Sequence, residues 1–295
     1  MADPLICALE NDALAVRISS VGAELQSVVR DGIERMWSGD PAVWGRRAPL
    51  LFPLIGRLRD GEYELGGRRI AAPTHGFCRD RAFAVSQESR TRVRFETASD
   101  EGTRGVYPFD FRLTVDFSLE GGTIVKTHTV VNTGDAPMPF ELGGHEAYAT
   151  CLLPGERMAD YHVLFEGLDK IEMFGMDEAG ILTLPKIAVP LEDGRLAKTP
   201  EQLGIDTIVL ENVPGSTATL ACSKNGHSVT VEFPDFPYLG LWTKAGQNDA
   251  RYLCIEPWSA LPDARFSPPE LAEKPGVRTL EPGESATLAY RMTFR

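Results

Sequence analysis

Three polar side chains of types that suit proton transfer stand in distinctive surroundings along this chain. Glu256 closes the strand-like run "YLCIE", immediately before Pro257. His145 lies in "LGGHEAY" and His75 in "PTHGFCRD", each beside a glycine that permits tight turns and close approach of the backbone to a ligand. A carboxylate and an imidazole are common partners in general acid and base catalysis. Glu256, His145 and His75 are therefore the catalytic candidates.

The strand around Glu256 predicts where its carboxylate points. Pro257 favours extended backbone in the residue before it, so the alternation of a strand should hold through Glu256. One face then carries Leu253 and Ile255, and the opposite face carries Tyr252, Cys254 and Glu256. If the aliphatic face is buried, the carboxylate projects from the other surface of the sheet.

Aromatic residues accompany these polar candidates in the sequence. Phe77 and Tyr148 lie near the two histidines, and Trp242 and Trp258 lie near Glu256. Aromatic rings beside a carboxylate and an imidazole suit a ligand with an apolar face and hydroxyl edges, such as a sugar. Trp242 and Phe77 are accordingly predicted to bind the substrate.

The other nucleophilic and metal-binding residue types carry weaker signals. The remaining histidines are expected to be surface or packing residues. The five cysteines are scattered without CxxC spacing, which argues against a disulfide framework and against a zinc ribbon. Cys78 is predicted to be a bystander, and Arg79 and Asp80 to brace the loop that carries His75. No metal site is predicted.

The elements that must position these residues are mostly strands. Residues 111–119 alternate apolar and polar side chains, and "EGG" at 120–122 leads into a second such run. Residues 216–224 and 227–233 flank Asn225-Gly226, a dipeptide typical of a tight hairpin turn. Two hairpins are predicted.

Helix is scarce and no linker divides the chain. The only helix predicted spans 267–276, with Ser267 as N-cap and Gly276 beyond its end, while 184–204 reads as a long Pro-punctuated connection. Many short strands favour an all-β fold, a large antiparallel β-sandwich. We expect residues 1–295 to form one domain.

Composition limits the partners. The formal net charge is -12 and the isoelectric point is near 5.0. An acidic chain repels phosphate backbones and anionic bilayers, so neither nucleic acid nor a membrane is expected as a partner. The first residues lack a signal-peptide pattern and no run approaches a membrane span. We expect a cytoplasmic monomer or homodimer that binds a small molecule.

Several motifs together resemble the aldose 1-epimerase (galactose mutarotase) family, in particular its LacX-like branch of smaller bacterial proteins. The motifs are "LLFPLIGRL", "HGFCRD", "GGHEAY", "DFPYLGLW" and "CIEPWSALPD", in family order over about residues 5 to 294. The resemblance implies a β-supersandwich with a cleft on one sheet and no cofactor. It also implies exchange of the α and β anomers of a free sugar.

The resemblance also implies roles for individual residues. Glu256 matches the family's general base, His145 its general acid and His75 the second histidine, which holds and polarises the ring oxygen. Arg57 and Asp206 match residues that bind sugar hydroxyls.

Two residues depart from the relatives. Glu146 follows His145 where proline is common, and Tyr148 stands where phenylalanine is usual. Strand alternation should point Glu146 away from His145. From ordinary pKa values near 4.3 for Glu and 6.5 for His, we expect an ionised Glu256 beside a protonated His145, with a neighbouring carboxylate raising the pKa of the histidine further.

Four other functions remain open at this stage. Two histidines and a carboxylate could form a metal triad, although short ligand spacings are missing. A glycoside hydrolase would pair Glu256 with Asp206 or Asp263. A non-catalytic carbohydrate-binding module is compatible with a β-sandwich. A hexose-phosphate mutarotase of the same fold would explain the cluster Arg46, Arg47, Arg57, Arg59, Arg68 and Arg69, which otherwise forms a solvated basic face.

Overall fold

One layer of the protein is a nine-stranded antiparallel sheet. The structure, a computed structural model, describes residues 4–244 and 251–295. The strands of this sheet lie in the order β16 (Arg195–Leu196), β13 (Tyr161–Leu164), β18 (Thr217–Cys222), β19 (Ser228–Glu232), β23 (Ser285–Phe294), β10 (Thr123–Asn132), β9 (Phe111–Glu120), β8 (Arg92–Ala98) and β7 (Ala84–Ser89).

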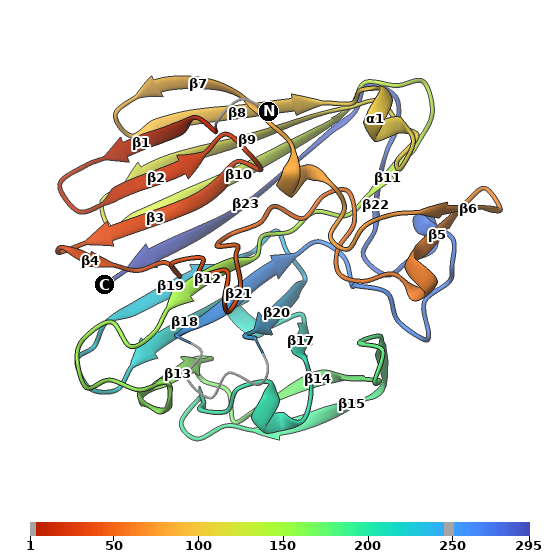
Figure 1. Cartoon of the computed structure of the whole chain (residues 1–295). Helices are drawn as coiled ribbons and strands as arrows, with labels where there is room; N and C mark the ends of the chain where they lie inside the picture. The colour runs from red at the N-terminus through yellow and green to blue at the C-terminus, as the bar shows by residue number, and fades with distance from the viewer. Residues whose placement is uncertain (1–3, 245–250) are drawn as a thin grey trace.

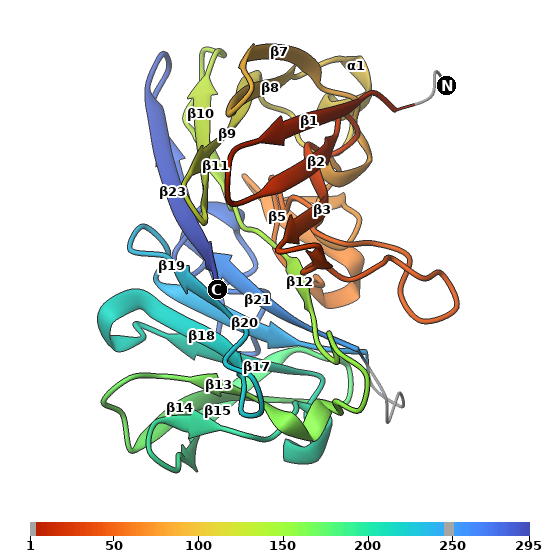
Figure 2. The same ribbon diagram turned by 90° about the vertical axis from the view of Figure 1, so that its left-hand side faces the viewer.

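Two smaller antiparallel sheets form the facing layer (Figures 1 and 2). The first contains β1 (Ile6–Glu10), β2 (Ala15–Ser19), β3 (Glu24–Arg30) and β4 (Ile33–Glu34). The second has the order β12 (Glu146–Ala149), β21 (Tyr252–Trp258), β20 (Tyr238–Trp242), β17 (Thr207–Glu211), β14 (Lys170–Met176) and β15 (Leu182–Pro190). A bridge between Met36 and Tyr148 joins the first sheet to the second.

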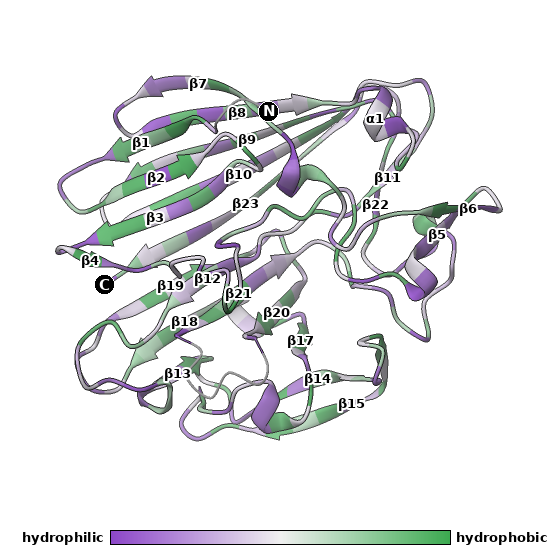
Figure 3. Ribbon diagram, in the orientation of Figure 1, coloured by the Kyte–Doolittle hydropathy of each residue, from purple (hydrophilic) through white to green (hydrophobic). Residues whose placement is uncertain are grey.

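The main apolar core fills the space between the layers. Val16 of β2, Val115 of β9, Leu220 of β18 and Leu239 of β20 belong to one buried cluster. Every second residue of β8 and β9 is buried, as strands with one buried face require. Figure 3 shows hydrophobic and hydrophilic residues interspersed along the strands of both layers. The expected large antiparallel β-sandwich is confirmed, and a single domain over 1–295 stays a prediction.

Both predicted hairpins are present. β9 and β10 pair from Glu120 opposite Thr123 across the Gly121-Gly122 turn. β18 and β19 also pair, but their turn is longer than the Asn225-Gly226 dipeptide suggested, since the Cys222 N–H donates to the His227 carbonyl at 2.9 Å and closes a loop over 223–226.

The predicted helix over 267–276 is wrong. That segment contains only the 3₁₀ turn η6 (Leu271–Glu273), and Glu270 and Lys274 on either side are extended. Prolines at 268, 269 and 275 remove amide donors and restrict the preceding residues, which stops the turn from growing. The one α-helix among the described residues is α1 (Glu101–Arg104), capped by Asp100.

The predicted connection over 184–204 contains more structure than expected. Most of β15 and all of β16 fall in it. Pro185 and Pro190 are compatible with β15 because this strand lies at the edge of its sheet, where a missing amide donor costs little.

Short elements complete the chain. Two strand pairs are β5 (Glu62–Leu65) with β6 (Arg68–Ala71) and β11 (Met138–Phe140) with β22 (Arg278–Leu280). The other 3₁₀ turns are η1 (Arg59–Gly61), η2 (Cys78–Asp80), η3 (Met158–Asp160), η4 (Glu201–Leu203) and η5 (Pro214–Ser216). No helix in the described ranges has the length and apolar character that crossing a membrane requires.

Candidate functional site

The two faces of β21 divide as the sequence predicts. Leu253 and Ile255 lie in the main core, while Tyr252 and Cys254 belong to a separate cluster on the other face of the sheet. Glu256 lies on the same face of β21 as Tyr252 and Cys254, and its side chain lines a cavity. We expected the strand to end at Glu256. It instead continues through Pro257 to Trp258.

A cavity of about 160 Å³ brings most of the predicted site residues together. Pockets for drug-sized ligands usually measure about 300–1,000 Å³, so this one suits a smaller molecule. Six of the seven predicted residues line it: Arg57, His75, His145, Asp206, Trp242 and Glu256.

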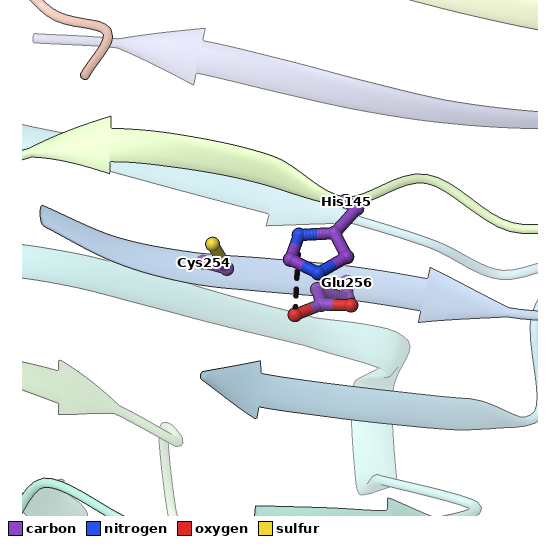
Figure 4. A group of neighbouring side chains, drawn as sticks. All are labelled: His145, Cys254 and Glu256. Atoms are coloured by element: carbon purple, nitrogen blue, oxygen red, sulfur yellow. Dashed lines mark ion pairs between the residues drawn. The ribbon is translucent and has the colours of Figure 1, made fainter. Parts of the chain in front are cut away.

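Glu256 and His145 face each other in this cavity (Figure 4). Their exposed fractions are 1% and 7%, and 3.4 Å separates His145 Nδ1 from Glu256 Oε1. This is ion-pair distance without hydrogen-bond geometry, since neither atom has a hydrogen-bond partner among the described residues. Two residues 111 positions apart in the sequence thus lie in direct contact.

Three rings hold the imidazole of His145 in place. Trp44 stacks on it with ring centroids 5.1 Å apart and an interplanar angle of 27°. Trp242 and His75 approach it edge-on, at 5.5 Å and 5.4 Å between centroids. Such packing restricts the ring to one orientation, which a proton donor or acceptor needs.

The backbone around His75 determines which nitrogen of its ring faces the cavity as a donor. Nδ1 accepts a hydrogen bond from the Gly56 N–H at 3.0 Å, and the His75 N–H donates to the Gly56 carbonyl at 3.0 Å. A neutral ring with an accepting Nδ1 carries its hydrogen on Nε2. Neutral His75 is therefore a hydrogen-bond donor through Nε2.

The loop of His75 adopts an uncommon backbone conformation. His75 has φ 65° and Gly76 has φ 66°, both in the left-handed region. A Cβ at Gly76 would lie 2.3 Å from the Phe52 carbonyl oxygen, so only glycine fits there. Non-glycine residues held in this region concentrate at functional sites.

Burial reverses the expected order of the two central pKa values. Loss of hydration raises the pKa of Glu256 well above its usual range, and the nearby Glu146 and Asp206 carboxylates raise it further. Burial lowers the pKa of His145 to about 3, with Arg79 and Arg46 acting in the same direction. The expected ionised Glu256 beside a protonated His145 is therefore not favoured in the free site, because burial shifts both side chains toward their neutral forms.

The pKa of His75 also falls well below its usual range. Loss of hydration is the main cause, and His145 and the arginines at 79, 46 and 57 add to it. His75 is neutral at pH 7 and retains the Nε2 hydrogen described above.

The neighbours of His75 have separate roles. The Asp80 carboxylate lies 2.9 Å from Arg46 and 3.7 Å from Arg79, so it braces the loop as expected. Arg79 also lines the cavity, which the sequence did not predict. Cys78 is buried in the main core.

Two aromatic residues lie away from the cavity wall. Phe77 packs against the main core, with its ring centroid 6.5 Å from Phe52 and 6.0 Å from Phe111, and it is not brought to the cavity. Tyr148 is buried in the core beside Phe294, because it alternates with the cavity-facing side of β12.

Other cavity residues were missed by sequence reasoning. Trp44 belongs to an irregular segment where no periodicity predicts its direction, Met176 is the last residue of β14, and Thr207 is the first residue of β17. Trp258 was noted as an aromatic neighbour and lines the cavity as well. A Cβ at Gly240 would lie 2.5 Å from its ring, so the strand beside Glu256 needs glycine at that point.

Glu146 points away from His145, as strand alternation predicts. Its Oε1 accepts hydrogen bonds from Lys126 of β10, at 2.8 Å, and from Tyr290 of β23. All three side chains are buried between the sheets. Glu146 therefore belongs to the core behind the cavity.

A larger cavity of about 450 Å³ lies elsewhere, lined in part by β13, β16, β18 and β21 and by the residue that follows β20. Tyr161, His162, Lys198 and Thr243 are among its lining residues. None of the predicted site residues lines it, so the smaller cavity remains the candidate site.

The family assignment follows from comparison with known proteins. The family model described as aldose 1-epimerase matches residues 6–293. The chain belongs to the aldose 1-epimerase family. Among curated relatives, the chromosomal LacX protein of Lactococcus lactis is 29% identical over 295 residues, which cover 97% of this chain and 98% of that protein.

Solved structures of aldose 1-epimerase relatives share the whole fold. A galactose mutarotase-like protein from Lactobacillus casei is 33% identical with a TM-score of 0.92, covering 99% of this chain and 100% of that one. A galactose mutarotase related enzyme from Lactobacillus acidophilus is 30% identical with a TM-score of 0.92, covering 99% and 97%. Family and fold support an enzyme of the isomerase type.

Proposed function

We propose that this protein is an aldose 1-epimerase that interconverts the α and β anomers of a free aldohexose, without a cofactor. The observation that carries the proposal is the contact of Glu256 with His145 in one small cavity that His75 also lines. A carboxyl and an imidazole in contact can move two protons on one sugar.

The reaction needs one proton removed and one supplied. Glu256 takes the proton of the C1 hydroxyl, while His145 gives a proton to the ring oxygen, and the C1–O5 bond breaks to leave an open-chain aldehyde. Rotation about C1–C2 and the reverse transfers close the ring with the opposite configuration at C1. Each transfer contributes about 10²–10⁴-fold to the rate.

Sugar binding prepares the pair for these roles. A C1 hydroxyl that donates to Glu256 stabilises its ionised form, and a ring oxygen that accepts from His145 stabilises the protonated imidazole. The proton shared by the pair then moves from Glu256 to His145 over the 3.4 Å contact. The Nε2–H of His75 supports the ring oxygen as a second donor.

The walls of the cavity suit the rest of a hexose. Trp44, Trp242 and Trp258 offer ring surfaces, and Arg57 and Asp206 offer donors and acceptors for hydroxyl groups. Aromatic walls with a few polar groups are typical of small-molecule sites.

The test is a polarimetric assay of the purified protein with freshly dissolved α-D-glucose, α-D-galactose and glucose 6-phosphate. We expect faster approach to anomeric equilibrium for at least one free hexose than in buffer alone. Sugar binding without acceleration would instead identify a non-catalytic binding protein, and release of sugar from an aryl glycoside would identify a hydrolase.

A hexose phosphate is the second candidate substrate, and two cations favour it. Arg57 and Arg79 both line the cavity, and guanidinium groups bind phosphate well. Preference for glucose 6-phosphate over both free hexoses in the same assay would establish this alternative.

A further inference from the structure

Three different ligand-type side chains gather on one face of β21 (Figure 4). His145, Cys254 and Glu256 each offer one donor atom, and these nitrogen, sulfur and oxygen atoms lie within 4.8 Å of one another. All three residues are buried. Cys254 has no role in the proposed reaction.

The strand register explains why these residues meet. Cys254 and Glu256 are two positions apart on β21, so their side chains leave the same face of the sheet. Ile255 between them pairs with Glu146 of the adjacent β12, which places His145 beside Glu256. The grouping is thus built into two paired strands.

Two of the donor atoms have no hydrogen-bond partner among residues 4–244 and 251–295. His145 Nδ1 and Glu256 Oε1 make no hydrogen bond within the described residues, although they lie 3.4 Å apart in a buried setting. Buried polar atoms are usually satisfied by protein, water or an ion. A cation between the two atoms would satisfy both.

We propose that His145, Cys254 and Glu256 form a binding site for a thiophilic divalent cation of the zinc class, and that the bound ion excludes the sugar. Nitrogen, thiolate and carboxylate ligands are those of Zn²⁺, whereas Mg²⁺ and Ca²⁺ prefer oxygen ligands alone. Binding releases the Cys254 thiol proton to solvent and forms a sulfur–metal bond.

The donor spacing fits a tetrahedral ion after small movements. Ligand distances of about 2.0–2.3 Å place tetrahedral donors roughly 3.3–3.8 Å apart. The 3.4 Å between His145 Nδ1 and Glu256 Oε1 already meets this requirement. The widest separation between donor atoms in the group is at most 4.8 Å, and side-chain rotation that shortens it by about an ångström would bring it into this range. The fourth ligand position is left for water from the cavity.

This triad differs from the pair of histidines and a carboxylate that the sequence suggested. Nδ1 of His75 already accepts the Gly56 N–H, so that atom is not available to a metal. Exclusion of the sugar rests on the proposed function, because the ion would occupy the atoms assigned to proton transfer. Metal binding itself does not depend on that function.

The experiment uses the full chain after treatment with a chelator. Zn²⁺ binding is measured by titration calorimetry, and Co²⁺ is added separately to detect a thiolate-to-cobalt charge-transfer band in the near ultraviolet. Cys254→Ser removes the sulfur ligand, and Cys222→Ser is the matched control, since Cys222 is a buried cysteine of β18 in the main core. Circular dichroism verifies that each variant is folded.

We expect one Zn²⁺ per chain, and a cobalt band that Cys254→Ser abolishes and Cys222→Ser retains. Affinity for Zn²⁺ should fall at least about 100-fold in Cys254→Ser, since losing even an outer partner of a ligand costs about 10–100-fold. Absence of zinc binding, or affinity and cobalt band unchanged in Cys254→Ser, would overturn the proposal. If that serine variant does not fold, Cys254→Ala is measured in the same way.

A rate assay separates this inference from the proposed function. Zn²⁺ should inhibit the wild type and Cys222→Ser, with reversal by chelator, and should inhibit Cys254→Ser far less, while the metal-free rate of Cys254→Ser stays that of the wild type. Cys254-dependent binding in a protein without mutarotase activity would support the metal site and refute the proposed function. Mutarotase activity that zinc inhibits equally in the wild type and in Cys254→Ser would support the proposed function and refute the metal site.

Discussion

At the scale of single residues, loss of hydration decides which protons the central pair holds. Glu256 and His145 are both buried, and burial disfavours the charged form of each. Burial therefore favours the neutral form of both groups in the free site. In the proposed reaction, sugar binding converts the pair into a base and an acid, so proton transfer would depend on the presence of the substrate.

Removing either member of the pair should abolish most of the activity. We expect Glu256→Gln and His145→Asn each to lower the mutarotase rate at least about a hundredfold, because each removes one proton-transfer group. His75→Asn should also lower the rate strongly, while Arg57→Ala should mainly raise KM. Polarimetry on folded, purified variants measures these effects, and near-normal rates for the first two would refute the assigned roles.

The pH profile should lack the step of an ordinary histidine. The pKa of His145 is lowered to about 3, so this imidazole gains no proton between pH 7 and 5, and burial holds the pKa of His75 well below its usual range. We expect kcat/KM to be nearly constant over this range, measured by polarimetry with stability checked at each pH. A step centred near pH 6.5 that disappears in His145→Asn would contradict this expectation.

At the scale of elements, β12 serves the site and the core with adjacent residues. His145, just before this strand, faces the cavity, while Glu146 turns to the core and accepts hydrogen bonds from Lys126 and Tyr290. Lys126 and Glu146 have fully buried side chains. This charged pair therefore joins β10 to β12, and the Tyr290 hydroxyl joins β23 to the same carboxylate.

Removing only the lysine of that pair should lower the free energy of unfolding more than neutralising both partners does. We expect Lys126→Met to lower the free energy of unfolding by about 3–5 kcal/mol, because it leaves a buried carboxylate without its cation. Lys126→Met combined with Glu146→Gln should recover at least about half of this loss, since the amide oxygen still accepts from Tyr290. Urea denaturation measures both.

An exposed ion pair provides the control. Lys170 and Glu172 are 3.4 Å apart with both side chains 58% exposed. Lys170→Met should change the free energy of unfolding by only about 0.5 kcal/mol or less. A similar loss of stability in Lys126→Met and Lys170→Met would contradict the expectation that breaking the buried pair costs more than breaking the exposed one.

At the scale of the whole molecule, buried ionisable groups make stability depend on pH in two directions. Burial lowers the pKa values of four histidines, His75, His128, His145 and the half-buried His162, so the unfolded chain binds more protons at these sites as pH falls below 6.5, and stability is lost. Burial raises the pKa of Glu141 to about 7 and that of Glu256 above its usual range. These two carboxyls bind protons first in the folded state, so stability rises as pH falls toward 4.5.

Four histidines against two carboxyls predict a net loss of stability as pH falls from 6.5 to 4.5, and a steeper loss below 4.5, where protonation of the two carboxyls no longer offsets it. His128, which packs against Tyr290 in the core and does not line the cavity, allows a test. His128→Phe should flatten the dependence between pH 6.5 and 4.5 by up to about 1.4 kcal/mol per pH unit, the value of one proton. Urea denaturation across this range measures the slope, and an unchanged slope would refute the role of His128.

The sequence by itself determined the local architecture of this protein. Alternation in residues 111–119 and 123–132 predicts β9 and β10, because a strand half-buried in a sandwich must place every second side chain in the core. The same rule separates Ile255 from Glu256, and His145 from Glu146. The motifs identified the family, yet Phe77 shows that a residue near the site in sequence can belong to the core.

Only the tertiary structure decided which residues meet and what charge they carry. Trp44, His75, His145 and Glu256 come from distant segments, and no local pattern specifies how the loops around the sheet fold over them. The pKa values of Glu256 and His145 depend on burial by the whole assembly, so ordinary side-chain values gave the wrong order. Hydration is lost through packing, and packing is a property of the folded chain.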